Sequence, residues 1–357
     1  MTMPVSRLNL NRYCLIFSDR TVSRGIMSTI ILVFFWQAAL FRTENLCSLL
    51  LNINTSHQGN QMPHPEIDCV LRIAAQIGES PIWSGADQSL YWVDITAGHL
   101  HRFDPVSGRN TTWEMGQEIG CFALCDSGDI IVALTSGFHQ FNPVTGGMTP
   151  IPGPVPGEQG HRFNDGTVDA AGRFYAGTMP LGGPTVQDAS GTLYCLNADL
   201  SVTRVMTGFH TINGMAFSPD ARTVYISDSF PDAQAIWAYD YDLDDGKWSN
   251  KRLFFDTNTV PGRPDGGAVD SDGCYWMAGV SGWHVLRITP DGHIDMDIAM
   301  PVEKPTRIAF GGPDLTTIYV TSISTGLTPG TVQPDAGGIF AFSVPGVSGV
   351  AFPKMQR

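Results

Sequence analysis

The chain has 357 residues, of which 43% are hydrophobic and 15% are charged, and its net charge is −13. The small charged fraction excludes an intrinsically disordered acidic chain. The negative charge lies after the first 61 residues, because residues 62–357 carry 16 basic and 32 acidic side chains. Such an acidic body lacks a basic stripe that could meet phosphates, so the sequence argues against a nucleic-acid partner.

Residues 1–61 contain an apolar run, Ile26–Phe41, between Arg24 and Arg42. A bilayer-spanning helix needs about 20 apolar residues, so this run is short. It is long enough for the core of a signal peptide, but no convincing small-residue cleavage site follows it. Three interpretations stay open: a membrane anchor, an export signal, and a poorly structured extension before a domain that opens at Met62. The third is favoured, and it predicts a cytoplasmic protein. Contact with a membrane is expected only if residues 26–41 act as an anchor.

From residue 89 onward, one pattern recurs six times: a β-branched or aromatic run, a turn, a second run and a turn rich in Gly and Asp. The starts of the first runs are 40, 44, 50, 51 and 43 residues apart. A period of about 40–50 residues with several strands in each unit is typical of a β-propeller. The six runs are Ser89–Asp94, Asp129–Ala133, Arg173–Gly177, Thr223–Asp228, Cys274–Ala278 and Thr317–Thr321.

The first five units each contain four predicted strands, whereas the sixth contains three. A further strand-like run, Ile67–Ile73, precedes the first unit and supplies the missing strand. Pairing it with the last unit would close the ring and remove two open sheet edges. We therefore predict an all-β, six-bladed β-propeller over residues 67–357, closed by an N-terminal strand added to the last blade.

Seven cysteines occur at irregular spacings and form no CxxC pair. Most of them fall within strand-like runs, where a free cysteine behaves as a small apolar residue. The sequence therefore favours reduced core cysteines in an intracellular protein over disulfides or a zinc site. The cysteines are Cys14, Cys47, Cys69, Cys121, Cys125, Cys195 and Cys274.

Polar side chains recur where the innermost strands of four units begin. These strands line the axis of a propeller and begin on one face, so we expect the polar residues to point into one funnel. A fifth candidate, which is acidic, ends the second strand of unit four. The candidates are Glu79, Asn164, Asn213 and Asp228, with Asp265 as a further one. A single Asn or Asp in such a place is most often a turn cap, but capping does not explain recurrence at the same point of different units.

Carboxylate and carboxamide oxygens form a hard ligand set, which suits Ca²⁺, Mg²⁺ or Mn²⁺ better than Zn²⁺. Four protein ligands would leave positions for water and substrate, because Ca²⁺ takes six to eight oxygens. Three histidines, His161, His210 and His284, lie near these loops without metal-ligand spacing. We interpret them as loop or rim residues, and among them His161 is expected to touch a ligand.

The propeller region resembles the SMP-30/gluconolactonase/luciferin-regenerating enzyme family, which includes regucalcin. Each motif that carries the resemblance is weak alone, but six in order at blade spacing are highly specific. The motifs are Gly78–Trp83, Arg162–Gly166 with Asp169–Arg173, Ile212–Gly214, Ile226–Ser229, Arg263–Gly266 and Lys304–Thr306.

The resemblance implies a divalent metal at the top of the channel and hydrolysis of a sugar lactone. It implies that Glu79, Asn213 and Asp228 bind the metal and that Asn164 lies at both metal and substrate. It further implies that Arg162 binds substrate and that Asp228 is the general base. The metal is expected to be Ca²⁺, with Mg²⁺, Mn²⁺ or Zn²⁺ as alternatives.

One departure from the family pattern affects substrate choice. Family members often place a substrate-contacting Glu just before the Gly-x-Leu-Tyr strand of unit three, where this chain has Gln187 or Asp188. The sequence thus predicts a metal-dependent lactonase, a carboxylic ester hydrolase, with the lactone itself open. Two alternatives stay open: hydrolysis of another ester or an organophosphate at the same site, and a non-catalytic calcium-binding or ligand-sensing propeller.

Overall fold

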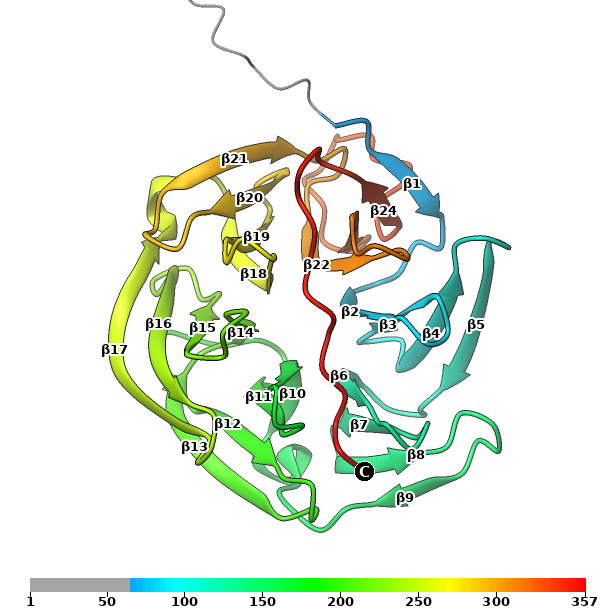
Figure 1. Ribbon diagram of the computed structural model, residues 1–357, viewed down its shortest axis with the longest axis vertical. Coiled ribbons are helices and arrows are strands. Elements are labelled where there is room, and N and C mark those ends of the chain that lie inside the picture. The colour runs from blue at the N-terminus through cyan, green and yellow to red at the C-terminus, as the bar shows by residue number, and fades with distance from the viewer. Residues whose placement is uncertain (1–64) are drawn as a thin grey trace, which may run out of the picture. The chain divides into compact units, whose positions relative to one another are not determined.

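The computed structural model describes residues 65–357 as a ring of six four-stranded antiparallel sheets (Figure 1). The six-bladed all-β propeller predicted from the sequence is confirmed. The predictions for residues 1–61, an extension, anchor or signal, lie outside the described residues. Within the described part of the chain, no helix has the length and apolar character needed to cross a bilayer.

The blades follow one another in sequence, and each begins with its innermost strand. Blade one consists of β2 (Gly78–Ser84), β3 (Ser89–Asp94), β4 (His99–Asp104) and β5 (Arg109–Glu114). Blade two consists of β6 (Ile119–Leu124), β7 (Ile130–Leu134), β8 (Gly137–Phe141) and β9 (Met148–Pro150). Blade three consists of β10 (His161–Val168), β11 (Phe174–Pro180), β12 (Gly191–Leu196) and β13 (Val202–Phe209).

The second half of the ring repeats this plan. Blade four consists of β14 (Ile212–Phe217), β15 (Thr223–Asp228), β16 (Ala235–Asp242) and β17 (Lys247–Asp256). Blade five consists of β18 (Arg263–Val269), β19 (Tyr275–Val280), β20 (His284–Ile288) and β21 (Ile294–Ala299). Blade six consists of β22 (Pro305–Gly311), β23 (Thr317–Ser322), β24 (Ile339–Phe342) and β1 (Asp68–Leu71). Two short 3₁₀ helices, η2 (Pro156–Gln159) and η3 (Thr257–Thr259), precede blades three and five.

The N-terminal strand closes the ring, as predicted. β1 pairs antiparallel with β24, with Asp68 opposite Ala341 and Cys69 opposite Phe340. β24 therefore gains a partner on its outer edge, and the first and last parts of the described chain share one sheet. Such closure removes an edge that could pair with another chain.

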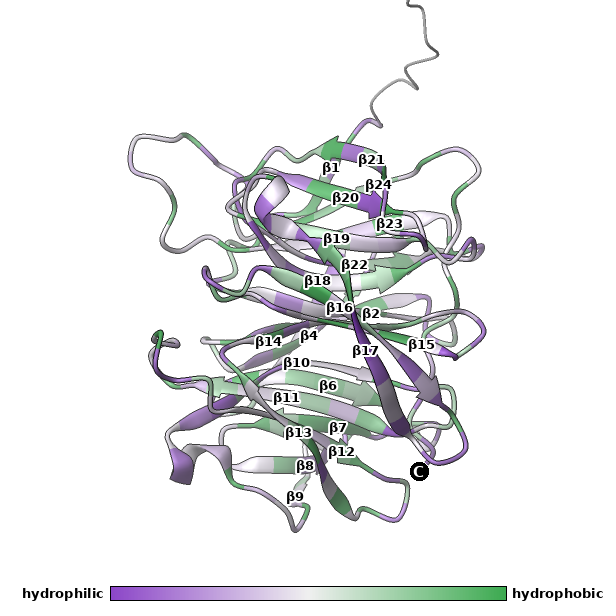
Figure 2. Cartoon of the chain, turned by 90° about the vertical axis from the view of Figure 1, so that its left-hand side faces the viewer, coloured by the Kyte–Doolittle hydropathy of each residue, from purple (hydrophilic) through white to green (hydrophobic). Residues whose placement is uncertain are grey.

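Hydrophobic side chains fill the spaces between blades. Leu100 of blade one and Phe122 of blade two belong to one fully buried cluster. Strands near the axis are buried on both faces, whereas the outermost strand β17 is mostly exposed and largely hydrophilic (Figure 2). This gradient explains why second strands such as β7 and β19 are rich in apolar residues while the outermost strand β17 is polar.

All five cysteines in the described residues are free thiols, as predicted. Four of them are buried, and burial raises the pKa of the Cys125 thiol to about 12 and that of Cys195 to about 11. Thiols with such high pKa values are poor nucleophiles and metal ligands near neutral pH, so these two serve as core residues.

The C-terminal segment crosses the axis of the ring, which the sequence analysis did not anticipate (Figure 1). Asp270 forms a β-bridge with Gly349, and Cys125 forms one with Met355. These two bridges connect the segment to blades five and two. The segment thereby covers the end of the channel at which the innermost strands finish, which we call the bottom face. The opposite end, where the innermost strands begin, is the top face.

Candidate active site

Each innermost strand carries one residue more than its neighbour near the top face. In five blades two consecutive residues of the inner strand oppose one residue of the next strand, and β6 has a single extra residue. This is the geometry of a β-bulge, which interrupts the alternation of side chains and can re-aim one of them. The first residues of the bulges are Ser80, Gly120, Asn164, Gly214, Asp265 and Thr306.

Direct contacts join the bulges into a closed ring around the axis. At three joints the backbones are so close that a Cβ on a glycine, at Gly120, Gly214 or Gly266, would lie within 3.0 Å of the next blade. The other joints are hydrogen bonds from Ser80 Oγ to Gly120 O (3.3 Å), from Asn164 Nδ2 to Asn213 Oδ1 (2.9 Å) and from Thr306 Oγ1 to Gly78 O (2.6 Å).

Glu79, directly before the first bulge, carries an unsatisfied oxygen. Its Oε2 accepts a hydrogen bond from the Ser80 amide (2.6 Å), whereas its Oε1 is buried without a hydrogen-bond partner among the described residues. Burial raises the pKa of the Glu79 carboxyl, although the charges of Arg307 and Arg162 oppose that rise. A buried polar oxygen without a donor is costly, so this atom is a natural ligand for a cation.

Asp265 lies near Glu79. Its pKa is raised well above the ordinary value of an aspartate, because it is buried and because the negative charge of Glu79 lies close to it. Arg263 and Arg162 oppose the rise. Two buried carboxylates that repel each other fit a bound cation, since its charge would satisfy both of them.

The two asparagines also meet at this place, as predicted. The side-chain amide of Asn164 donates to Asn213 Oδ1 (2.9 Å) and to the Ile212 carbonyl (3.0 Å). Asn213 in turn donates to Ser229 Oγ (2.6 Å). Because Ser229 Oγ also donates to the Pro264 carbonyl, the network reaches the residue before Asp265.

Arg162 lies at the rim of this group. Its Nη1 donates to Asn164 Oδ1 (2.8 Å) and to the Phe163 carbonyl (2.9 Å), and its Nε is 3.9 Å from Glu118 Oε2. The side chain is 12% exposed. The guanidinium is therefore held in place while its Nη2 is left to bind a further oxygen.

The histidines of the top face are engaged with the protein itself. His161 contacts Ser190 Oγ through Nε2 (2.6 Å) and the Gln159 carbonyl through Nδ1 (2.7 Å). His284 is similarly held between Asp297 (3.0 Å) and the Pro261 carbonyl (3.0 Å). Neither ring presents a free nitrogen in this arrangement, so the structure adds no support for the ligand contact expected of His161.

The loop between β11 and β12 carries the two residues that stand near the expected Glu. Asp188 accepts a hydrogen bond from Ser190, the residue that also contacts His161, while Gln187 lies beside it on the exposed loop. This loop adjoins His161 and His210, because Val186 O lies 3.5 Å from His210 Nε2. It therefore borders the top face next to Arg162.

Asp228 has different contacts from the other candidates. Its carboxylate accepts backbone hydrogen bonds from His210 (2.8 Å), Thr211 (3.0 Å) and Phe230 (3.1 Å), and His210 Nδ1 lies 3.3 Å from it. Asp94 does the same in blade one, where it accepts from the amides of residues 76 and 77. Both residues end the second strand of their blade. The arrangement favours an anchoring role for Asp228 in the loop before β14 over the ligand and general-base roles expected from the sequence.

We expect Asp228→Asn to lower the free energy of unfolding by about 1–3 kcal/mol, because an amide group would replace an acceptor facing buried N–H groups. Divalent-cation binding should persist with unchanged stoichiometry. Urea denaturation and calorimetric cation titration check the two effects. Asp94→Asn is the matched control and should destabilise similarly. If the Asp228→Asn protein folds but binds no cation, Asp228 is a metal ligand, as the sequence predicted.

A buried ion pair joins the second residues of two bulges, one position further along the inner strands than Asn164 and Thr306. Arg307 donates to Asp165, and the same guanidinium donates to the carbonyls of Gly166 (3.1 Å) and Met215 (3.3 Å). The two paired side chains are 4% and 1% exposed. Neither residue has a predicted role from the sequence. An arginine within the apolar inner run 305–311 was the available signal, since an unpaired buried arginine is rare.

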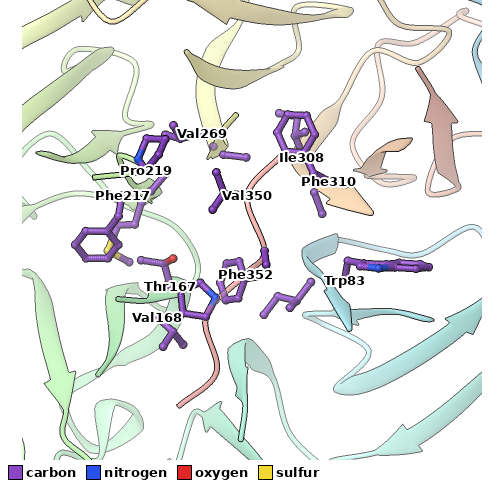
Figure 3. A pocket seen from close by; sticks show the side chains of 18 of the residues that line it. Trp83, Thr167, Val168, Phe217, Pro219, Val269, Ile308, Phe310, Val350 and Phe352 are labelled. Atoms are coloured by element: carbon purple, nitrogen blue, oxygen red, sulfur yellow. The ribbon is translucent and has the colours of Figure 1, made fainter. Parts of the chain in front are cut away.

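Towards the bottom face the channel becomes apolar. A cavity of about 140 Å³ lies there, and among the described residues Arg307 is the one charged side chain that lines it. Val350 and Phe352 of the C-terminal segment lie among Trp83, Phe217 and other apolar side chains (Figure 3). Within the channel, the candidate oxygen ligands therefore lie at its top-face end.

The residues described, 65–357, contain no group of three or more His, Cys, Asp or Glu side chains suited to a metal ion. The polar group at the top face has two carboxylates, Glu79 and Asp265, supplemented by the carboxamides of Asn164 and Asn213. Its donors are all oxygens, which is the chemistry of hard cations such as Ca²⁺. The unsatisfied Glu79 Oε1 shows that the residues present fit such an ion.

Comparison with known proteins adds independent information. Residues 77–324 match the model of the SMP-30/Gluconolactonase/LRE-like region. A 6-deoxy-6-sulfogluconolactonase of Pseudomonas putida is 42% identical over 258 residues, which cover 72% of this chain and 86% of the relative. Regucalcin of Xenopus laevis is 35% identical over 291 residues, covering 80% of this chain and 97% of the relative.

A solved structure shares the architecture. The structure of a luciferin-regenerating enzyme superimposes with a TM-score of 0.75 at 27% identity, covering 82% of this chain and 100% of that one. The matched region of the family model begins just before Glu79 and ends beyond the last bulge. All of the bulge residues of the top face are thus included in the similarity.

Proposed function

Because the chain belongs to the SMP-30/gluconolactonase/LRE-like family, we propose that it is a divalent-metal-dependent hydrolase that opens a sugar lactone. The names of its relatives include a lactonase of a sugar acid. The observation that carries the proposal is the unsatisfied buried Oε1 of Glu79, which lies in a ring of oxygen donors at the top of the channel.

We assign the metal ligands to Glu79, Asn213 and Asp265, with Asn164 at the border between metal and substrate. We assign to Asp265 the ligand role expected for Asp228. Asp265 occupies a bulge and lies close enough to Glu79 for the charge of Glu79 to raise its pKa. The Asp228 carboxylate, in contrast, already accepts hydrogen bonds from backbone amides. Calcium is the ion expected, because two carboxylates and two carboxamides leave coordination positions for water and substrate.

A bound cation supplies a Lewis acid that polarises the lactone carbonyl and stabilises the charge developing on its oxygen. The protein positions the substrate. The Arg162 guanidinium, held by Asn164 and Glu118, can bind a sugar hydroxyl through its Nη2 and fix the ring relative to the carboxylates. We assign the proton acceptor to Asp265, the carboxylate that occupies a bulge of the inner strand within the group of oxygen ligands.

Chelation tests the proposal directly. Treatment with EDTA should abolish hydrolysis of gluconolactone and also lower the thermal midpoint, because a ligand that binds only the native state stabilises it by about 2.7 kcal/mol at 100 times its Kd. Adding Ca²⁺ or Mn²⁺ should restore both. A pH-drop assay and differential scanning calorimetry measure these effects, with a parallel organophosphate substrate to separate the two ester classes. Full lactonase activity in excess EDTA would refute the metal mechanism.

A further inference from the structure

Cationic side chains recur at one position of the top face. The position lies two residues before the start of the bulge in the innermost strand. It holds Arg162 in blade three, Arg263 in blade five and Lys304 in blade six. In blade two the same position holds Glu118. The rim of the site therefore carries three positive charges and one negative charge at equivalent places.

These rim cations differ in their partners. Arg162 faces Glu118, and Lys304 Nζ donates to the carbonyls of Thr325 (3.1 Å) and Gly326. Arg263 makes one long hydrogen bond, from Nη1 to the Ser229 carbonyl (3.4 Å). Within residues 65–357, no carboxylate oxygen lies within 4.0 Å of its guanidinium. Arg263 is thus the rim arginine with most of its donors free.

The position of Arg263 relative to the ligands is defined by the strand β18. It begins β18 two residues before Asp265, is half-buried, and bonds the carbonyl of Ser229, whose hydroxyl accepts a hydrogen bond from Asn213. The guanidinium therefore lies beside the proposed metal ligands but is not one of them. An arginine in such a place can bind an oxyanion with two parallel hydrogen bonds.

We propose that Arg263 binds a sulfonate or comparable oxyanion at the end of the substrate remote from the lactone carbonyl, so that the preferred substrate is an anionic sugar lactone. This inference rests on the proposed lactonase function. The sulfonated lactone in the name of the Pseudomonas putida relative shows that substrates of this chemistry occur among proteins of similar sequence. A neutral gluconolactone would lack a negatively charged group for Arg263 to bind.

A competing role for Arg263 is to balance the charge of the two buried carboxylates. That role predicts equal effects on every substrate, because it acts through the metal site. Anion recognition predicts a larger loss on charged lactones than on neutral ones, expressed in KM. Comparing substrates that differ only at the remote carbon therefore separates the two roles.

The experiment compares the wild type, Arg263→Gln and Arg263→Lys with gluconolactone, 6-deoxy-6-sulfogluconolactone and 6-phosphogluconolactone. Arg263→Gln should raise KM for both anionic lactones by on the order of tenfold to a hundredfold, because a charged hydrogen-bonded partner is lost. The kcat/KM for the anionic lactones should therefore fall relative to that for gluconolactone, and Arg263→Lys should recover part of the loss. Arg252→Gln, which removes the same charge from an outer-strand pair with Asp240, is the control.

Equal losses on neutral and anionic lactones, or a wild type without preference for the anionic ones, would overturn the role of Arg263. An effect on the sulfonated but not the phosphorylated lactone would support it and define the oxyanion. If no lactone is hydrolysed at all, the proposed function fails separately. In that case, calorimetric titration with 6-deoxy-6-sulfogluconate still tests the inference. The inference requires that the wild type binds this compound and that Arg263→Gln does not.

Discussion

Replacing Glu79 by glutamine is expected to abolish both cation binding and lactone hydrolysis while the propeller stays folded. The substitution keeps the shape of the side chain but removes its negative charge, and it allows an amide nitrogen to occupy the place of the unsatisfied oxygen. Loss of a charged ligand and of the Lewis acid it holds should lower kcat/KM by at least about a thousandfold.

The same variant has a distinctive effect on stability. Burial raises the pKa of Glu79 in the folded protein, so in the cation-free protein its contribution to stability is present at low pH and lost as the pH rises through that raised pKa. At pH 7 the neutral glutamine avoids this penalty, and cation-free Glu79→Gln should melt no lower than the cation-free wild type. Adding Ca²⁺ should stabilise only the wild type.

Glu303→Gln is the matched control for that experiment. Glu303 is also buried, but its carboxylate accepts hydrogen bonds from Thr328 and Gln333, which lower its pKa. Its replacement should reduce stability and leave cation binding intact. Calorimetric titration with Ca²⁺ and thermal scans with and without EDTA distinguish the two variants. A Glu79→Gln protein that still binds one cation tightly would remove Glu79 from the ligand set.

Arg307→Met is expected to be the most destabilising single change in the channel. It would leave Asp165 buried without its ionic partner, and breaking a buried pair in this way costs about 3–5 kcal/mol. It would also remove the hydrogen bonds to the carbonyls of Gly166 and Met215, which connect blades three, four and six across the axis.

The double variant Arg307→Met/Asp165→Asn tests the origin of that loss. It removes the uncompensated charge while keeping an acceptor for one backbone amide, so it should recover much of the stability lost in Arg307→Met. Urea denaturation of the four proteins in this cycle measures the coupling. Additive effects of the two substitutions would show that the pair is not a stabilising unit.

The architecture was predictable from the sequence because it depends on local patterns. Strand-forming runs separated by turns recur at blade spacing, and the three-stranded last unit already implied closure by the run at Ile67–Ile73. The structure confirms both, with β1 paired to β24. The meeting of Asn164 with Asn213 at the start of the inner strands was also correctly anticipated, because equivalent positions of a propeller converge on one axis.

Local sequence did not distinguish between acidic residues with similar surroundings in the chain. Asp228 and Asp265 both lie in short polar motifs at the top face, and only the strand register shows that Asp265 occupies a bulge while Asp228 accepts amides of the preceding loop. The pairing of Arg307 with Asp165 was likewise hidden, since 142 residues separate them.

The sequence alone thus determined the ring, its closure, the free thiols among residues 65–357 and the set of polar residues from which a site could be built. The tertiary structure decided which oxygens of that set are satisfied by the protein and which are left for a ligand. The physical reason is that strand formation depends on side-chain pattern over a few residues. The satisfaction of a buried carboxylate depends instead on the donors that distant segments bring to it.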